Sequence, residues 1–270
     1  MSDNASAFLP AVEELARESG AILMRHFRKL KTYEKKGAID LQTIADRESE
    51  SYLTHEIMRR LPAHSVIAEE DGRVLNPGSD YLWIIDPLDG TTNFAHGLRL
   101  FAVSIALTHR GAVIAGAVYA PALDEMYLAA RGAGATLNGA TIRVSETSEI
   151  IDALLVTGFP YNRVDHMDEI VGMHRACLEE SRGVLRLGAA ALDFAAVAAG
   201  FIDAFYEFGL KPWDMAAGAL LVEEAGGKIG GLLDGEPLDL FKPRCIASNG
   251  AIHSEVLRLL MRGGAESLPR

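Results

Sequence analysis

The chain has 270 residues, of which 49% are hydrophobic and 23% are charged. This is the composition of an ordinary globular protein, and it excludes a disordered chain, a collagen-like repeat and a coiled coil. The 26 basic and 37 acidic side chains give a net charge of -11, which repels nucleic acid. If the ligand is nevertheless an anion, bound cations are the obvious means of attracting it.

The two cysteines lack CxxC spacing, which excludes a disulfide framework and a thiolate zinc site and fits a reducing compartment. The first ten residues include Asp3 and no basic residue, so we expect no secretory signal. No run of 18 apolar residues occurs, so we also expect no membrane span and no membrane partner. These features predict a cytoplasmic protein.

The first part of the chain predicts helices followed by short strands. Apolar residues at near-helical spacing predict helices over 8–27 and 43–61. The polar segment 32–41 (TYEKKGAIDL), with a central glycine, predicts a hairpin or mobile loop. Short apolar runs over 65–68 and 81–85 predict strands, and acidic residues lie at the C-terminal end of each.

The sequence pattern changes after about residue 100. Short β-friendly runs punctuated by glycine turns predict an antiparallel meander over 101–144. Beyond 150, strands and helices alternate again. Strands are expected over 154–157, 184–187 and 204–207, and helices over 166–180, 189–199, 215–225 and 251–261. The pattern predicts a mixed α/β layered protein with an N-terminal α+β half, 1–150, and a C-terminal α/β half, 151–270.

The most informative segment for function is 83–94 (WIIDPLDGTTNF), which contains an acidic turn. We expect a buried strand to end at Asp86, where Pro87 interrupts the ladder, so that Asp86, the Leu88 carbonyl and Asp89 converge in one turn. These hard oxygen donors suit Mg²⁺ or Mn²⁺ rather than zinc. Gly90 lets the backbone approach an anion, and Thr91-Thr92 could start a helix whose free N–H groups point at that anion. The same sequence also makes a good surface turn, and its spacing alone favours that interpretation.

Other acidic residues are predicted at strand ends and helix starts. Glu69 and Glu70 follow the strand 65–68, where the plain alternative is a solvated loop. Asp214 precedes a predicted helix, where it could simply be the N-cap. Asp46, near the start of a helix, could be there for the helix dipole, and Glu207 could be an ordinary strand-end residue. Several such carboxylates in one α/β protein are nevertheless the expected components of a shared cation site, since they repel one another unless cations neutralise them.

Two long motifs give a specific resemblance. The segments 83–94 (WIIDPLDGTTNF) and 213–227 (WDMAAGALLVEEAGG) resemble the two signature stretches of the inositol monophosphatase family, which are lithium-sensitive, Mg²⁺-dependent phosphomonoesterases. The segments 65–70 (SVIAEE) and 203–209 (DAFYEFG) match in order and spacing. The pair Thr92-Asn93 favours this branch over the nucleotide-phosphatase and bisphosphatase branches.

The resemblance implies an α/β/α/β/α sandwich of the sugar-phosphatase type, usually a homodimer, that hydrolyses its ester with metal-activated water and no protein nucleophile. It implies two or three Mg²⁺ ions, with Mn²⁺ as a substitute. The implied ligands are Glu69, Asp86 and the Leu88 carbonyl for the first ion, Asp86, Asp89 and Asp214 for the second, and Glu69 again for a weaker third.

The other implied roles surround these ligands. Gly90 and Thr91 would offer N–H groups to the phosphate, Thr91 with Asp46 would orient or deprotonate the attacking water, and Glu70 would support the site. Lys35 falls in the counterpart of a mobile loop over the metals. Glu207 with Ala190 would contact the hydroxyls of a small phosphorylated sugar or polyol.

One position departs from the family pattern. Ala189, in the stretch Gly188-Ala189-Ala190, stands where relatives often have serine or threonine, and this removes a hydroxyl from the substrate side of the pocket. The expected activity is hydrolysis of myo-inositol monophosphate. The alternatives are a phosphatase of another small ester, such as fructose 1,6-bisphosphate, histidinol phosphate or NADP, and a non-catalytic scaffold that retains the fold.

Overall fold

Two long helices form the first layer of the structure, a computed structural model that describes residues 5–29, 34–35, 41–233 and 236–268. They are α1 (Leu9–His26), which follows the short 3-10 helix η1 (Ala5–Phe8), and α2 (Ile44–Arg60), and each ends within one residue of its predicted bounds. The buried face of α2 changes character along its length: Asp46 and Ser49 lie near its start, and Leu53 and Ile57 follow at helical spacing. The N-terminal turn of α2 therefore brings polar groups into the interior.

The second layer is an eight-stranded sheet in the order β10-β9-β8-β7-β6-β5-β3-β4. It contains one parallel pair, β3 with β5, and its other neighbours are antiparallel, which confirms the predicted meander. The strands are β3 (Ser65–Ala68), β4 (Val74–Leu75), β5 (Tyr81–Asp89), β6 (Ala102–His109), β7 (Ala112–Ala120), β8 (Glu125–Ala130), β9 (Gly134–Leu137) and β10 (Ala140–Thr141).

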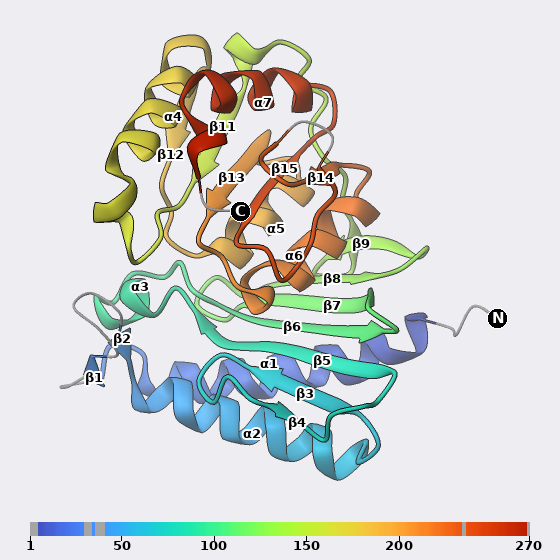
Figure 1. Cartoon of the computed structure of the whole chain (residues 1–270). Coiled ribbons are helices and arrows are strands. Elements are labelled where there is room, and N and C mark those ends of the chain that lie inside the picture. Colours follow the sequence, from blue (N-terminus) through green and yellow to red (C-terminus); the bar gives the residue numbers. More distant parts are fainter. Residues whose placement is uncertain (1–4, 30–33, 36–40, 234–235, 269–270) are drawn as a thin grey trace.

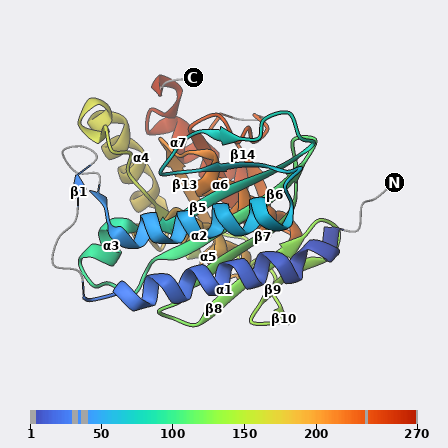
Figure 2. The same ribbon diagram turned by 90° about the horizontal axis from the view of Figure 1, so that it is seen from below.

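The side chains of this sheet divide between its two faces by the period of two. Val103, Ile105 and Leu107 of β6 pack toward α1 and α2, which cover one face in Figures 1 and 2, whereas Ala102 and Ala106 join the core on the other face. Small residues on that second face let a helix approach closely. A Cβ added at Gly116 would lie 3.1 Å from the Cα of Ala217 in α6.

A five-stranded mixed sheet forms the fourth layer, in the order β12-β11-β13-β15-β14. Its strands are β11 (Leu154–Thr157), β12 (Gly183–Leu185), β13 (Ala204–Phe208), β14 (Lys228–Gly230) and β15 (Arg244–Ser248). Helices α5 (Ala190–Ala198) and α6 (Pro212–Glu224) lie between the two sheets, and α4 (Met167–Glu180) and α7 (His253–Arg262) cover the outer face of the smaller one (Figure 1). The predicted α/β/α/β/α layering is confirmed.

The short elements complete the chain. They are the antiparallel pair β1 (Glu34–Lys35) and β2 (Leu41–Gln42), helix α3 (Thr91–Ala95), and the 3-10 helices η2 (Ile150–Asp152), η3 (Arg163–His166) and η4 (Ala265–Ser267). The predicted boundary at 150 falls between the last strand of the large sheet and the first of the small one. Among the described helices, none is both long and apolar enough to cross a membrane. We propose that the halves 1–150 and 151–270 fold as one unit, because one core cluster contains Ile84 of β5, Phe194 of α5 and Phe205 of β13.

Two local predictions were wrong, and two strands were missed. Strand β5 does not end at Asp86 but continues to Asp89, and its pairing shifts by one residue because Asp86 faces Ser104 while Asp89 faces Ala102. This bulge accommodates Pro87, which has no N–H to donate to the ladder. Helix α6 begins at Pro212 rather than at 215, since proline fits the first helical turn. Strands β14 and β15 were not predicted.

Candidate active site

The bulge at the end of β5 turns several oxygen atoms toward one edge of the large sheet. Asp86 and Asp89 are both buried, and one carboxylate oxygen of Asp86 accepts a hydrogen bond from the Leu88 N–H at 2.9 Å. Strand β3 runs parallel to β5, so Glu69, which follows β3, lies at the same edge. The two acidic strand ends therefore meet, as the sequence indicated.

Asp214 joins them from the other half of the chain. Ser104, which faces Asp86 across the sheet, donates a hydrogen bond to the carbonyl of Trp213 at 3.1 Å, and this contact fixes the start of α6 beside β5. Asp214 is not the N-cap of α6 but its third residue, and its carboxylate accepts a hydrogen bond from the Lys211 N–H at 2.7 Å. The N-cap alternative is thus wrong.

The pKa values of Asp86 and Asp214 are raised because the acidic side chains are buried close together. Burial raises the pKa of Asp86 well above its usual range, and the negative charges of Glu69, Asp89 and Asp214 raise it further, as does a hydrogen bond with the Glu69 side chain. Burial likewise raises the pKa of Asp214, with Glu69 and Asp89 next in effect. Four carboxyl groups from three separate segments thus share one electrostatic environment, in which a cation would replace shared protons.

The chemistry of this donor set fits a hard divalent cation, because it consists of carboxylates and one backbone carbonyl. The side chains as they stand are not a formed coordination sphere: within the described part of the chain, no three His, Cys, Asp or Glu side chains are arranged so that they could hold a metal ion together. Asp89 explains part of this, since its two oxygens accept hydrogen bonds from the N–H groups of Ala190 and Ala191 at 3.2 and 2.8 Å. Binding of an ion would require small rotations of these carboxylates.

A second cluster lies where α2 meets α3. The Thr91 hydroxyl lies 3.2 Å from Oδ1 of Asp46 and 3.0 Å from the Leu88 carbonyl, so it can donate to either. The other oxygen of Asp46 accepts from both the N–H and the hydroxyl of Thr43, which closes a capping box at the start of α2. Burial raises the pKa of Asp46 to about 6, and the charge of Glu70 also raises it. Asp46 therefore both caps its helix and orients a hydroxyl.

Gly90 is the N-cap of α3 and adopts φ +84°, a left-handed conformation that side-chain-bearing residues rarely adopt. A Cβ at this position would also lie 3.0 Å from the Leu100 carbonyl oxygen and 3.1 Å from the Cβ of Ala189. Glycine is thus required both by the turn and by the close approach of the segment that carries Ala189.

Two predicted residues belong to the segments beside this cluster. The carboxylate of Glu70 accepts a hydrogen bond from the Gln42 side chain of β2. Lys35 lies in β1, which pairs with β2, and β2 packs against α3. The side chain of Lys35 lies outside the described residues.

The other wall of the site comes from the second half of the chain. A cavity of about 120 Å³ is lined by Asp89, Gly90 and Thr91 from the first half of the chain and by Ala189, Ala190, Glu207 and Asp214 from the second. Asn93 holds the two walls together, because its amide donates to the carbonyls of Leu100 and Leu187 at 2.7 and 2.8 Å. Burial raises the pKa of Glu207 to about 8, with repulsion from Asp89 second and attraction by Arg186 opposing both.

Asp193, Arg186 and Gly158 are among the lining residues of this cavity that were not predicted from the sequence. Asp193 is buried, and neither of its carboxylate oxygens has a hydrogen-bond partner among the described residues; the exposed Arg186 and the small Gly158 also line the cavity. A Cβ at Gly158 would lie 2.0 Å from a carboxylate oxygen of Glu207, so glycine makes room for that side chain. A single acidic residue in the otherwise apolar run 188–200 was the signal available for Asp193.

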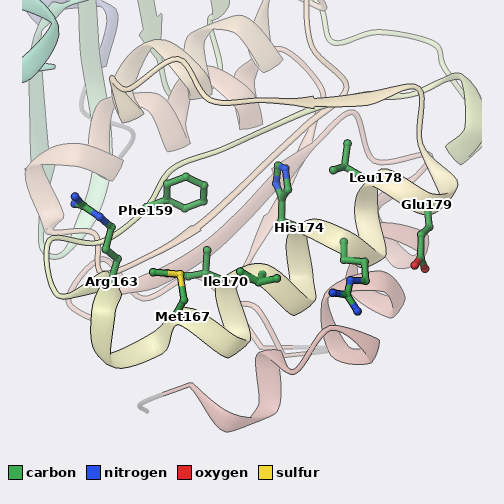
Figure 3. Close-up of a pocket in the computed structure, with 9 residues that line it drawn as sticks. Phe159, Arg163, Met167, Ile170, His174, Leu178 and Glu179 are labelled. Carbon is green, nitrogen blue, oxygen red and sulfur yellow. The ribbon is translucent and has the colours of Figure 1, made fainter.

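A larger cavity, of about 610 Å³, lies against α4. Figure 3 shows Phe159, Ile170 and His174 around it, with Arg163 and Glu179 toward its ends. Its lining offers a single carboxylate, Glu179, and no group of acids to hold cations. The smaller acidic cavity therefore remains the candidate site.

Comparisons with known proteins agree with this geometry. The model of the inositol monophosphatase family matches residues 4–263. An inositol-1-monophosphatase of Mesorhizobium japonicum is 39% identical over 259 residues, covering 95% of this chain and 97% of the relative. A Nus factor SuhB of Pseudomonas aeruginosa is 46% identical over 220 residues, which is 79% of this chain and 81% of the relative.

The solved structure of an inositol monophosphatase from Anabaena (Nostoc) superimposes with a TM-score of 0.87 at 42% identity and covers 96% of this chain and 97% of that one. Members of this family depend on metal ions, in agreement with the acidic edge of the large sheet. The chain belongs to the inositol monophosphatase family and is a phosphoric monoester hydrolase.

Proposed function

We propose that this enzyme hydrolyses myo-inositol monophosphate, or a close polyol phosphate, with Mg²⁺ as its cofactor. The observation that carries the proposal is the shared electrostatic environment of Glu69, Asp86, Asp89 and Asp214. Two of these acids, Asp89 and Asp214, line one small cavity together with Thr91, whose hydroxyl bonds to Asp46. An acidic protein requires such a cation-binding centre to attract a phosphate.

Glu69, Asp86, the Leu88 carbonyl, Asp89 and Asp214 are the proposed ligands of two or three Mg²⁺ ions, with Mn²⁺ as a substitute. When bound, such ions activate a water molecule and neutralise charge on the transferring phosphoryl group. Lithium is the expected inhibitor.

The residues of the chain orient the reactants around these ions. Gly90 and Thr91 direct backbone N–H groups toward the phosphate from the start of α3. The Thr91 hydroxyl positions the attacking water, and Asp46, buried beneath it, accepts the proton that Thr91 passes on. Glu70, in the loop after β3, supports this pair while bonded to Gln42 of β2, and Lys35 belongs to the segment that closes over the metals.

The second wall binds the alcohol part of the ester. Glu207 accepts hydrogen bonds from polyol hydroxyls, and Ala190 packs beside it. Ala189 offers no hydroxyl, so discrimination among polyols rests on fewer contacts than in relatives with serine or threonine there. Fructose 1,6-bisphosphate, histidinol phosphate and NADP are therefore the alternative substrates to compare.

The test is phosphate release from a panel of inositol phosphates, sugar phosphates, histidinol phosphate and NADP, with Mg²⁺, with a chelator and with lithium. We expect the highest kcat/KM for an inositol monophosphate, no turnover with chelator, and inhibition by lithium. Absence of Mg²⁺-dependent release from every ester would refute the phosphatase proposal and favour a scaffold. Some relatives are named Nus factors, so that outcome would direct attention to protein partners.

The family resemblance also supports two coarser proposals about the protein as a whole. We propose a homodimer, to be checked by light scattering on the purified protein. We propose a cytoplasmic location, to be checked by fractionation of cells.

A further inference from the structure

Helix α2 touches three separate segments of the site with one face. Asp46, Ser49 and Glu50 stand at i, i+3 and i+4, so their side chains lie together on the helix surface. Asp46 binds Thr91 at the start of α3, and Ser49 donates to the Pro87 carbonyl in the β5 bulge at 3.1 Å. The buried Ser19 hydroxyl of α1 holds Ser49 at 2.5 Å.

Glu50 makes the third contact, with the loop after β3. One oxygen of its carboxylate accepts from the Glu70 N–H at 2.7 Å, and the other accepts from the Asp71 N–H at 3.0 Å. Glu50 thus holds the backbone next to Glu69 through two hydrogen bonds. None of the roles derived above includes Glu50.

The backbone of this loop needs Glu50. The Glu69 N–H bonds to the Ile85 carbonyl at 3.2 Å and the Gly72 N–H to the Ala68 carbonyl at 3.0 Å, so main-chain partners serve the two ends of the loop. The two N–H groups between them are served by the Glu50 carboxylate. Charge-assisted bonds of this kind are stronger than neutral ones, and here they hold three consecutive acidic residues close to α2 despite their mutual repulsion.

We propose that Glu50 is a positioning residue: it fixes the loop 69–71 against α2 and thereby sets Glu69 in register with Asp86 and Glu70 in register with Asp46. Residues 46, 49 and 50 of this one helix thereby fix the positions of the three segments that form the metal and phosphate site relative to one another. This inference rests on the proposed function, because it assigns Glu50 a role in placing a metal ligand.

The test compares Glu50→Ala and Glu50→Gln with Glu48→Ala in the full chain. Glu48 is the matched control because it lies on the same helix and carries the same charge but contacts His26 and Arg25 on the exposed surface. A cavity of about 210 Å³ borders Glu50, Glu70 and Asp71, so water can reach the freed N–H groups and the alanine variant is expected to fold. Glu50→Gln retains one acceptor oxygen and provides the measurement if the alanine variant does not fold.

Two measurements distinguish a positioning role of Glu50 from a purely structural one. Without metal, amide hydrogen exchange in the segment 69–72 should accelerate about tenfold in Glu50→Ala, and less in Glu50→Gln, while Glu48→Ala matches wild type. Calorimetric Mn²⁺ binding should weaken about tenfold or more in Glu50→Ala, since supporting residues typically affect metal affinity by that amount. At saturating Mg²⁺, KM for the ester should change less than twofold.

Faster exchange with unchanged Mn²⁺ affinity would overturn the positioning role and leave a structural one. Wild-type exchange, or an equal loss in Glu48→Ala, would overturn the inference altogether. Because exchange and Mn²⁺ binding need no turnover, these results remain distinct from failure of the phosphatase assay.

Discussion

The two walls of the acidic cavity differ in how their carboxylates are held. On the wall formed by the large sheet, Asp86 and Asp89 accept hydrogen bonds from backbone N–H groups, and Asp46 accepts from Thr43. On the wall formed by α5 and β13, Asp193 has no hydrogen-bond partner among the described residues, and Glu207 is buried with a raised pKa.

This difference separates a reaction wall from a recognition wall. Carboxylates fixed by backbone N–H groups cannot move far, which suits groups that must hold ions in a set geometry. A buried carboxyl group that lacks a protein partner, as Asp193 does among the described residues, is left to bond with hydroxyls of a ligand. Substitutions on the first wall should therefore abolish turnover, whereas those on the second should change substrate affinity and preference.

The largest expected effect is that of Asp86→Asn on the first wall. It removes a charged ligand that we assign to two ions, so kcat/KM should fall at least about a thousandfold, corresponding to several kcal/mol of transition-state stabilisation. Without metal, Tm should be unchanged or higher, because asparagine removes a buried charge that Glu69, Asp89 and Asp214 repel.

Asp80→Asn is the matched control, since Asp80 directly precedes β5 at the opposite end of that strand and is exposed. It should retain wild-type turnover. Rates near wild type in Asp86→Asn at saturating Mg²⁺ would contradict the assignment of the first wall.

The next largest effect is that of Glu207→Gln on the second wall. Glutamine keeps the size of the side chain but replaces one carboxyl oxygen with an NH2 group that cannot accept a hydrogen bond, so KM for inositol monophosphate should rise about tenfold while kcat changes less. Steady-state kinetics with several esters provides the measurement, and Glu149→Gln, at an exposed position, serves as control. A fall in kcat as large as that of Asp86→Asn would erase the distinction between the walls.

Gly158→Ala tests the same wall without replacing an ionisable residue. Its new Cβ would collide with the Glu207 carboxylate, so the side chain must turn out of its position, and KM should rise somewhat less than in Glu207→Gln. Gly183→Ala is the matched control, because the nearest atom to its Cβ, in Leu154, lies 3.8 Å away. Unchanged KM in Gly158→Ala would show that the observed position of Glu207 does not matter for binding.

The two walls also differ in how far the sequence predicts them. Asp86, Leu88, Asp89, Gly90 and Thr91 lie in one contiguous motif, and a strand followed by a proline and a glycine is a local signal. Even there the prediction ended β5 three residues early, because a bulge depends on the neighbouring strand that pairs with it.

Residues of the second wall meet only through tertiary structure. Glu207 has its space because Gly158, which directly follows β11, the parallel neighbour of β13, has no side chain. Asp193 resembles any acidic residue in an alanine-rich helix, and Glu50 any charged residue of a helix surface. The residues that contact them are distant in sequence, and no periodic pattern in a single sequence identifies such contacts. The layered fold was predictable because hydrophobic periodicity is local, as the agreement for α1 and α2 illustrates.

The smallest effect, and the finest test of the recognition wall, is that of Ala189→Ser. Ala189 is the N-cap of α5 and has no side-chain hydrogen bond, so a serine hydroxyl adds a cap at a position where serine is favoured. The gain should be only about 0.5 kcal/mol, or about 1–2 °C in Tm, because the Asp89 carboxylate already accepts from the first two N–H groups of this helix. Since Ala189 also lines the cavity, the hydroxyl should lower KM for inositol monophosphate about twofold relative to less hydroxylated esters. Ala191→Ser, in the same helix but outside the cavity lining, separates the two contributions. If both variants alter KM equally, the hydroxyl missing at 189 is not a determinant of polyol preference, and recognition rests on Glu207 and its neighbours alone.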